Sequence, residues 1–187
     1  MADSEATLRA AEDIVRFLQQ HQVDAVVIGA VALAAYHYVR QTEDIDLGVN
    51  ASVPKLREVT QSLQEAGYHA DLREPDGDDP LGGVIDVHGD FGSLQIVSFA
   101  GRFPAVIDDA VSNSNLVVRK GSPLKLVPIP HLIALKLYAG GFKSKADIVA
   151  LLVRNPDLDL KSVRSLCQGY QLPGLDELIE EAERERP

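Results

Sequence analysis

The sequence predicts a mixed α/β fold of the α+β kind, with a sheet in its N-terminal part and a helical bundle at its C-terminal end. The apolar residues 26–28 end in Gly29 and are followed by a helical pattern, which is typical of a strand that opens into a helix. Two apolar runs at 84–88 and 94–99 flank a short Gly-Asp-Phe-Gly segment and predict an antiparallel hairpin. From Pro130 onward the pattern is helical, with breaks at glycine and proline, which predicts the bundle.

The N-terminal half alternates helices and strands. Residues 4–20 carry apolar side chains at helical spacing, with Asp3 or Ser4 as the N-cap, and predict an amphipathic helix. A later helix begins at Pro54 and ends at Gly67, which suits the left-handed position after a helix. The elements expected before the hairpin are a helix at 4–20, a strand at 24–28, a helix at 30–38, a strand at 45–49, a helix at 54–67 and a strand at 68–72.

The rest of the core contains a loop and three short elements. Residues 74–83 hold two prolines, three glycines and three aspartates, and predict an exposed loop that borders the active site. After the hairpin we expect a helix at 103–111 and short strands at 116–118 and 124–127, separated by Gly-Ser-Pro.

Length and composition fit one well-packed domain with a helical appendage. The chain has 187 residues, of which 45% are hydrophobic and 25% are charged, as in ordinary globular proteins. We therefore expect an α/β core at 1–128 and a C-terminal helical subdomain at 129–187 that packs on it.

Charge and cysteine usage narrow the partners and the compartment. The formal net charge of −10 disfavours broad binding to duplex nucleic acid, because that affinity comes from Lys and Arg on phosphates. Cys167 is the single cysteine, so an intramolecular disulfide is excluded. The N-terminus lacks the apolar segment of a secretory signal, and the apolar run at 25–35 is too short to span a bilayer. We expect a cytoplasmic protein with no membrane contact.

Asp44 and Asp46 form the sharpest chemical signal in the chain. Residues two apart in a strand project from the same face, so the two carboxylates lie side by side while Ile45 and Leu47 turn into a core. Two ionised carboxylates this near to each other repel, unless a divalent cation neutralises their charge. Mg²⁺ prefers such oxygen ligands and keeps places for water and substrate phosphate, which predicts a magnesium site here.

The same stretch resembles the nucleotidyltransferase superfamily related to DNA polymerase beta. The strand VVIGA, the helix VALAAYHYV and the segment RQTEDIDLGV follow in the order of that family's signature. The Arg-x-Thr-x-Asp-Ile-Asp-Leu form looks most like the AbiEii-type abortive-infection and toxin–antitoxin nucleotidyltransferases. PHLIALKL and KSKADI resemble that group's C-terminal helices, so the resemblance spans about 26–152. The chain departs from the family at Ala30, the second residue of the usual glycine pair.

This resemblance implies a mostly antiparallel nucleotidyltransferase-type sheet, a two-metal Mg²⁺ site and a nucleoside triphosphate as substrate. The catalytic and metal-binding residues that it implies begin with Asp44 and Asp46. Backbone amides after the first strand hold phosphates, and later side chains form the rim. The nucleotide-binding candidates are Gly29, Ala30, Arg40, Thr42 and Lys136, with Lys143 and Lys145 as further candidates.

The family's third carboxylate comes from a strand beside the Asp-x-Asp strand, and the hairpin must supply it. If the first arm of the hairpin is that strand, the residue is Asp86; if the second arm is, the position holds Gln95. A turn at 89–92 places Asp86 directly across from Gln95 on the same face, so Asp86 reaches the same site from the neighbouring strand. We therefore assign Asp86 as the third catalytic and metal-binding residue.

The sequence thus predicts a Mg²⁺-dependent nucleotidyltransferase that moves a nucleotidyl group from a nucleoside triphosphate to an acceptor hydroxyl. The resemblance implies a tRNA end or a protein as acceptor, a toxin role and an antitoxin partner, and the residues do not choose between the acceptors. Two alternatives stay open: a non-catalytic nucleotide-binding or partner-binding member of the same fold, and an acidic protein–protein scaffold.

Overall fold

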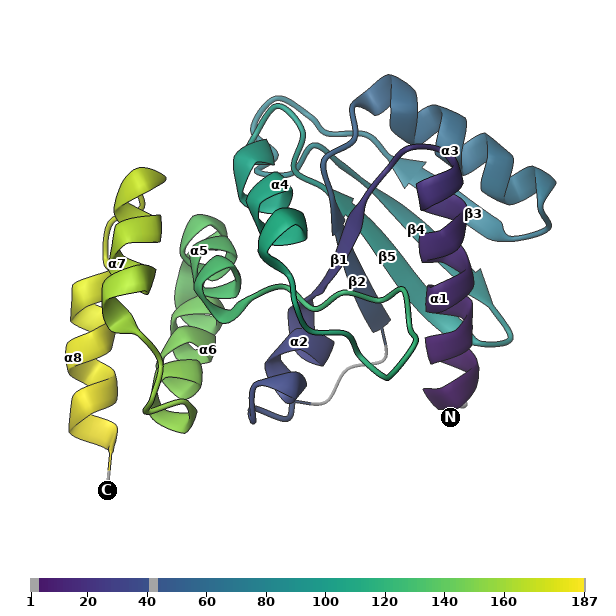
Figure 1. Cartoon of the computed structure of the whole chain (residues 1–187). Coiled ribbons are helices and arrows are strands. Elements are labelled where there is room, and N and C mark those ends of the chain that lie inside the picture. Colours follow the sequence, from purple (N-terminus) through teal and green to yellow (C-terminus); the bar gives the residue numbers. More distant parts are fainter. Residues whose placement is uncertain (1–3, 41–43, 187) are drawn as a thin grey trace.

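A five-stranded mixed sheet forms the centre of the protein (Figure 1). The computed structural model describes residues 4–40 and 44–186. The strand order is β1-β2-β5-β4-β3, and β2 with β5 is the one parallel pair in the described sheet. The mixed, mostly antiparallel sheet is therefore confirmed. The strands are β1 (Ala25–Ile28), β2 (Asp44–Val49), β3 (His69–Arg73), β4 (Gly83–Gly89) and β5 (Gly92–Ser98).

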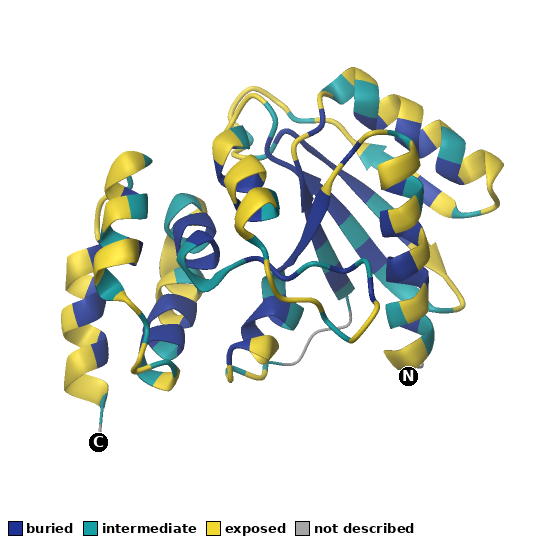
Figure 2. Ribbon diagram, in the orientation of Figure 1, coloured by how far each residue is buried: buried dark blue, intermediate teal, exposed yellow. Residues whose placement is uncertain are grey.

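Two amphipathic helices, α1 (Ser4–Gln20) and α3 (Val53–Glu65), cover one face of this sheet. Alternate strand residues such as Leu47 and Ile96 are fully buried against them. Figure 2 shows the buried stripe along α1 facing the strands and the exposed stripe facing solvent. The predicted bounds of α1 are confirmed, because its apolar residues recur at helical spacing throughout.

The remaining helices pack around the other face and one end of the sheet. A second buried cluster joins β1, the end of β5 and all of these helices, which in Figure 1 extend away from the sheet as far as α7 and α8. The predicted boundary between residues 128 and 129 stays a prediction, although the helices beyond it share this core with the sheet. They are α2 (Gly29–Ala35), α4 (Pro104–Asn113), α5 (Ile129–Ala139), α6 (Gly141–Arg154), α7 (Leu160–Gly169) and α8 (Leu175–Glu185).

Two sequence expectations are wrong in detail. The predicted short strands at 116–118 and 124–127 form only isolated bridges, Val117 to Lys125 and Leu126 to Val27, because the nearby prolines at 123 and 128 cannot donate to a ladder. The helix predicted at 30–38 ends at Ala35, since the backbone turns into a left-handed conformation at His37.

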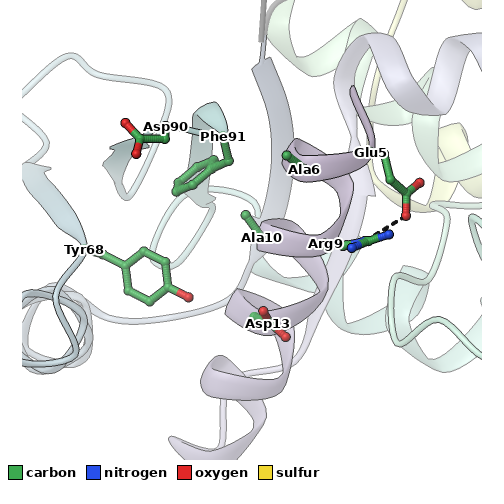
Figure 3. Close-up of a pocket in the computed structure, with 8 residues that line it drawn as sticks. All are labelled: Glu5, Ala6, Arg9, Ala10, Asp13, Tyr68, Asp90 and Phe91. Carbon is green, nitrogen blue, oxygen red and sulfur yellow. Dashed lines mark hydrogen bonds and ion pairs between the residues drawn. The ribbon is translucent and has the colours of Figure 1, made fainter. Parts of the chain in front are cut away.

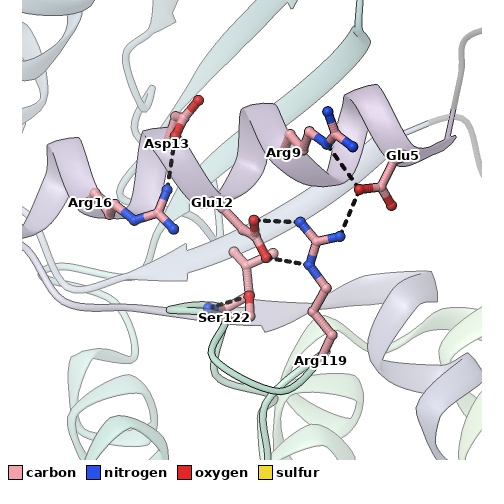
Figure 4. A network of polar contacts seen from close by, with 8 residues as sticks. Glu5, Arg9, Glu12, Asp13, Arg16, Arg119 and Ser122 are labelled. Atoms are coloured by element: carbon pink, nitrogen blue, oxygen red, sulfur yellow. Dashed lines mark hydrogen bonds and ion pairs between the residues drawn. The ribbon is translucent and has the colours of Figure 1, made fainter.

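Arg119 ties the segment between α4 and α5 to the first helix (Figure 4). Its guanidinium donates to both carboxylate oxygens of Glu12, at 2.8 and 2.6 Å, and to Glu5 at 2.7 Å. The Glu12 side chain is 9% exposed. Hydrogen bonds from Arg119 and then from Ser122 lower the pKa of Glu12 to about 2. Glu12 therefore stabilises the folded protein as a carboxylate.

Replacing Glu12 with Gln is expected to lower stability at neutral pH by about 2 kcal/mol, the usual contribution of hydrogen bonds to a charged group. Because the pKa of Glu12 in the folded protein lies below its ordinary value of 4.5, this contribution is present above pH 4.5 and is lost as the pH falls towards 2. Melting temperatures from pH 7 to 2.5 should therefore converge for wild type and Glu12→Gln. Asp13→Asn, which breaks an exposed pair with Arg16, is the control; a constant gap over this pH range contradicts the prediction.

Candidate active site

Asp44 and Asp46 lie on β2 with their side chains on the face opposite α1 and α3, as the sequence predicts. Both are partly buried, while Ile45 and Leu47 between and after them are in the core. The Ser93 hydroxyl on the neighbouring strand β5 donates a hydrogen bond to Asp44. The strand therefore holds the two carboxylates side by side.

Gly29, the residue between β1 and the body of α2, lies directly against Asp46. Its φ of +65° is in the left-handed region, and an added Cβ would lie 2.8 Å from the Cγ of Asp46. Both the backbone conformation and the contact therefore require glycine. The structure brings the predicted residues Gly29 and Asp46 together, with Ala30 buried as the next residue of α2.

Asp46 is in an environment that suits a bound cation. Burial, and then the neighbouring charge of Asp44, raise the pKa of Asp46 to about 6. Within the described residues its carboxylate accepts no hydrogen bond and forms no ion pair. Three cations, Lys136, Arg40 and Lys143, act in the opposite direction from farther away. A carboxylate in this state gains from a divalent ion beside it, so the pair fits Mg²⁺.

The described residues supply only part of a metal coordination sphere. No cluster of three or more His, Cys, Asp or Glu side chains in them is arranged to hold a metal ion. Asp44 and Asp46 would thus provide two ligands, with the others coming from water, substrate phosphate or neutral oxygens.

Asp147 on α6 anchors two of the cations that face Asp46. Lys136 Nζ donates to Asp147 Oδ2 at 2.6 Å, and Arg40 Nη1 lies 3.2 Å from the same oxygen. The Asp147 side chain is only 2% exposed. Asp147 therefore holds the predicted residues Arg40 and Lys136 together. The predicted Lys145 is exposed on α6, and Thr42 lies outside the described residues.

Sequence reasoning did not select Asp147 as a site residue. It lies inside the stretch 143–148 that carries the family resemblance, and it interrupts an apolar helical face, since Ile148 and Leu151 beside it are fully buried. An aspartate within an apolar helical face is buried only when cationic partners neutralise it. This position in the pattern is the sequence signal that could have identified Asp147.

Replacing Asp147 with Asn is expected to destabilise the protein by about 3 kcal/mol, because it leaves Lys136 and Arg40 partly buried without their counter-ion. Thermal unfolding of this variant measures the loss. Asp157→Asn, an exposed position after the same helix, is the control and should melt with the wild type. Equal stability of Asp147→Asn and wild type would contradict the ion-pair role.

The sheet register decides which hairpin residue lies beside Asp46. β5 pairs with β2, so Gln95 is the direct neighbour of Asp46, and Asp86 on β4 lies across from Gln95. The predicted hairpin alignment is thus confirmed. Gln95 Nε2 donates to Asp86 Oδ1 at 2.7 Å, and Arg73 donates to Asp86 Oδ2 at 2.5 Å. Burial favours the neutral acid, but these two hydrogen bonds outweigh it and lower the pKa of Asp86.

A pocket of about 510 Å³ lies elsewhere (Figure 3). It is formed by α1, by Tyr68 before β3 and by Asp90 and Phe91 in the hairpin turn. An ion pair of Glu5 with Arg9 lies at its edge. This pocket has no residue in common with the carboxylate pair, so the chemistry of Asp44 and Asp46 does not involve it.

Comparisons with known proteins show the fold. No family model and no curated protein matches the chain in sequence. The solution structure of the antibiotic-resistance factor ANT(2″)-Ia matches 91% of this chain and 93% of its own, with a TM-score of 0.54 and 17% identity. The same protein in complex with adenylyl-2″-tobramycin matches 88% of this chain and 96% of its own (TM-score 0.53, 15% identity). An antigenic nucleotidyltransferase-like protein from Paracoccidioides brasiliensis matches 96% and 94% (TM-score 0.53, 13% identity). The chain therefore has a nucleotidyltransferase-like fold.

Proposed function

We propose that this protein is a Mg²⁺-dependent nucleotidyltransferase, which moves a nucleoside monophosphate from a nucleoside triphosphate to an acceptor hydroxyl and releases pyrophosphate. The observation that carries the proposal is the Asp44–Asp46 pair, because Asp46 is partly buried without a hydrogen-bond or ion-pair partner among the described residues. The nucleotidyltransferase-like fold around the pair supports it. None of the described helices is long and apolar enough to cross a membrane.

One group of residues would bind the metal, and another would contact the phosphates. Asp44 and Asp46 would hold Mg²⁺, which when bound neutralises the charge of the transferred phosphoryl group and activates the acceptor hydroxyl. Lys136 and Arg40, fixed by Asp147, would contact the triphosphate together with Lys143. Catalysis then rests on positioning and charge stabilisation, as is usual for phosphoryl transfer.

The remaining parts of the proposal rest on the sequence resemblance. It supports phosphate contacts from the amides of Gly29 and Ala30, and a rim role for Thr42. It also supports a tRNA end or a protein as acceptor and, with that, a toxin role that an antitoxin protein would restrain.

The experiment that tests the proposal is a thermal-shift panel with ATP, CTP, GTP or UTP, each with Mg²⁺ and with EDTA. A ligand at one hundred times its dissociation constant stabilises the folded state by about 2.7 kcal/mol, which is several degrees for a chain of this size. We expect the shift only with Mg²⁺, followed by transfer of radiolabel to a tRNA or protein acceptor. No shift with any triphosphate at millimolar concentration favours the acidic scaffold.

A second candidate function is nucleotide binding without transfer. The observation that favours it is Gln95, since a neutral amide occupies the position beside Asp46 on the neighbouring strand. An amide cannot act as a base towards the acceptor hydroxyl. Under this candidate the thermal shift persists, but no label is transferred to any acceptor.

A further inference from the structure

A small apolar pocket of about 250 Å³ lies beside the carboxylate pair. It is enclosed by the end of β1, by α5 and by the loop that precedes β4. Its walls include the buried side chains of Ile28, Phe99, Leu132 and Leu135. Pro80 and Leu81 close it on the loop side.

The pocket and the carboxylate pair share a wall. Gly29 lines the pocket and also lies against the carboxylate of Asp46. Lys136 lines the pocket as well, and its charge acts on Asp46. A molecule bound at Asp46 by its phosphates is therefore directly beside this pocket.

The lining of the pocket offers little for hydrogen-bond recognition. Among the described lining residues, Lys136 already donates to Asp147, and the Tyr138 hydroxyl donates to the carbonyl of Pro80 at 2.8 Å. Ser144 adds one hydroxyl, which both donates and accepts and so does not distinguish the edges of different rings. A group held here is held by apolar contact.

We propose that this pocket receives the base of the nucleoside triphosphate and holds it without reading its edge, so that all four triphosphates bind with similar affinity. The inference rests on the proposed function. The pocket is smaller than the usual 300–1,000 Å³ of sites for whole drug-sized ligands, so it suits one planar ring system. Strong discrimination between similar ligands needs several placed polar groups, and the side chains of this lining offer only the Ser144 hydroxyl beyond those already paired.

The test compares nucleotides with inorganic tripolyphosphate, which has the phosphates and no base. Calorimetry in Mg²⁺ should show wild type binding each triphosphate about tenfold tighter than tripolyphosphate, and the four within about threefold of one another. Ala139→Phe places a ring in the pocket from the exposed last residue of α5. It should reduce every nucleotide to the affinity of tripolyphosphate and leave tripolyphosphate binding unchanged.

The matched control is Ala66→Phe. Ala66 is also exposed, also at a helix end and also followed by a glycine, but it lies at the end of α3 away from the pocket. If no nucleoside triphosphate binds wild type in Mg²⁺, both the proposed function and this inference are overturned. If tripolyphosphate binds and Ala139→Phe keeps the nucleotide affinity, the pocket inference alone fails. A preference of more than about tenfold for one base overturns the proposal that the pocket does not select between the four bases.

A second variant tests the wall of the pocket. Tyr138 and Tyr170 both pack on Phe103, with ring centroids 4.7 and 5.0 Å away. The Tyr138 hydroxyl donates to the carbonyl of Pro80, and the Tyr170 hydroxyl donates to the carboxylate of Asp109. Only the Tyr138 hydroxyl holds the loop, at Pro80. Tyr138→Phe should weaken nucleotide binding about threefold or more without changing tripolyphosphate binding, whereas Tyr170→Phe should change neither. Equal nucleotide affinity in Tyr138→Phe and Tyr170→Phe overturns the role of this wall.

Discussion

Replacing Asp44 and Asp46 together by Asn is expected to weaken Mg²⁺-dependent nucleotide binding at least about 100-fold and to raise the melting temperature of the free protein. Asparagine keeps the shape of each side chain but removes the charge that holds a divalent ion. The Asp46 carboxylate is partly buried beside Asp44, so its negative charge lowers the stability of the free protein. A bound cation, or removal of the charge, relieves this destabilisation.

The stability gain has a defined pH dependence. The pKa of Asp46 is raised from 3.8 to about 6, so the folded state disfavours the ionised group, and this penalty is present above pH 6 and absent below pH 3.8. The shift corresponds to an upper limit of about 3 kcal/mol, which predicts a gain of about 3–8 °C at pH 7.5. At pH 4 the variant and wild type should melt within about two degrees of each other.

Calorimetry with Mg²⁺ and ATP, together with thermal unfolding at the two pH values, checks both parts. The control removes the same charge from exposed positions, with Asp71→Asn on β3 and Asp90→Asn in the hairpin turn. It should bind nucleotide like the wild type. Unchanged nucleotide affinity in the Asp44→Asn, Asp46→Asn protein would falsify the metal site.

Local sequence signals were enough for the parts of the fold that local forces determine. The helical spacing of α1 gave its bounds, and the glycines at 89 and 92 fixed the turn that aligns Asp86 with Gln95. The period-two alternation on β2 separated the carboxylates from the core. Each of these follows from residues close together in the chain.

Contacts between residues far apart in the chain could not be predicted from such local patterns. The order of the strands, which sets Gln95 beside Asp46, depends on how the hairpin docks on β2. Arg119 donates to Glu12, which is 107 positions away in the sequence, and Arg40 donates to Asp147, which is also 107 positions away. The predicted strands at 116–118 and 124–127 became isolated bridges, because the prolines at 123 and 128 limit any longer ladder, and only Leu126 pairs with β1, at Val27.

The assignment of Asp86 as the third catalytic residue is a prediction that the register makes more specific. Asp86 is two strands away from Asp46, which is about 10 Å at the usual strand spacing. Its carboxylate can only accept, so the amide nitrogen of Gln95 must face it, and the amide oxygen of Gln95 is directed away from β4. If the proposed metal binds at Asp44 and Asp46, Asp86 would either reach the site through water or orient the oxygen of Gln95 towards it.

In both cases, Asp86→Ala is expected to lower nucleotidyl transfer at least about 100-fold, the usual effect of losing an acid–base group or a metal-site residue. Nucleotide binding at Asp44 and Asp46 should change much less. Arg73→Ala removes the other partner of Asp86 while keeping Gln95 in place, so it serves as the control with near wild-type transfer. Radiolabel transfer and calorimetry on the same preparations separate the two effects.

Gln95→Glu completes the test, because it places a third carboxylate directly beside Asp46 in the register of β5. Three results together would place the third oxygen ligand beside Asp46 in the sheet. Wild type transfers label, Asp86→Ala abolishes the transfer, and the double variant with Asp86→Ala and Gln95→Glu restores part of it. If Asp86→Ala transfers at the wild-type rate, the assignment of Asp86 is wrong. If wild type transfers nothing while Gln95→Glu does, Gln95 marks a protein that binds nucleotides without transferring them, since one added carboxylate then supplies the missing chemistry.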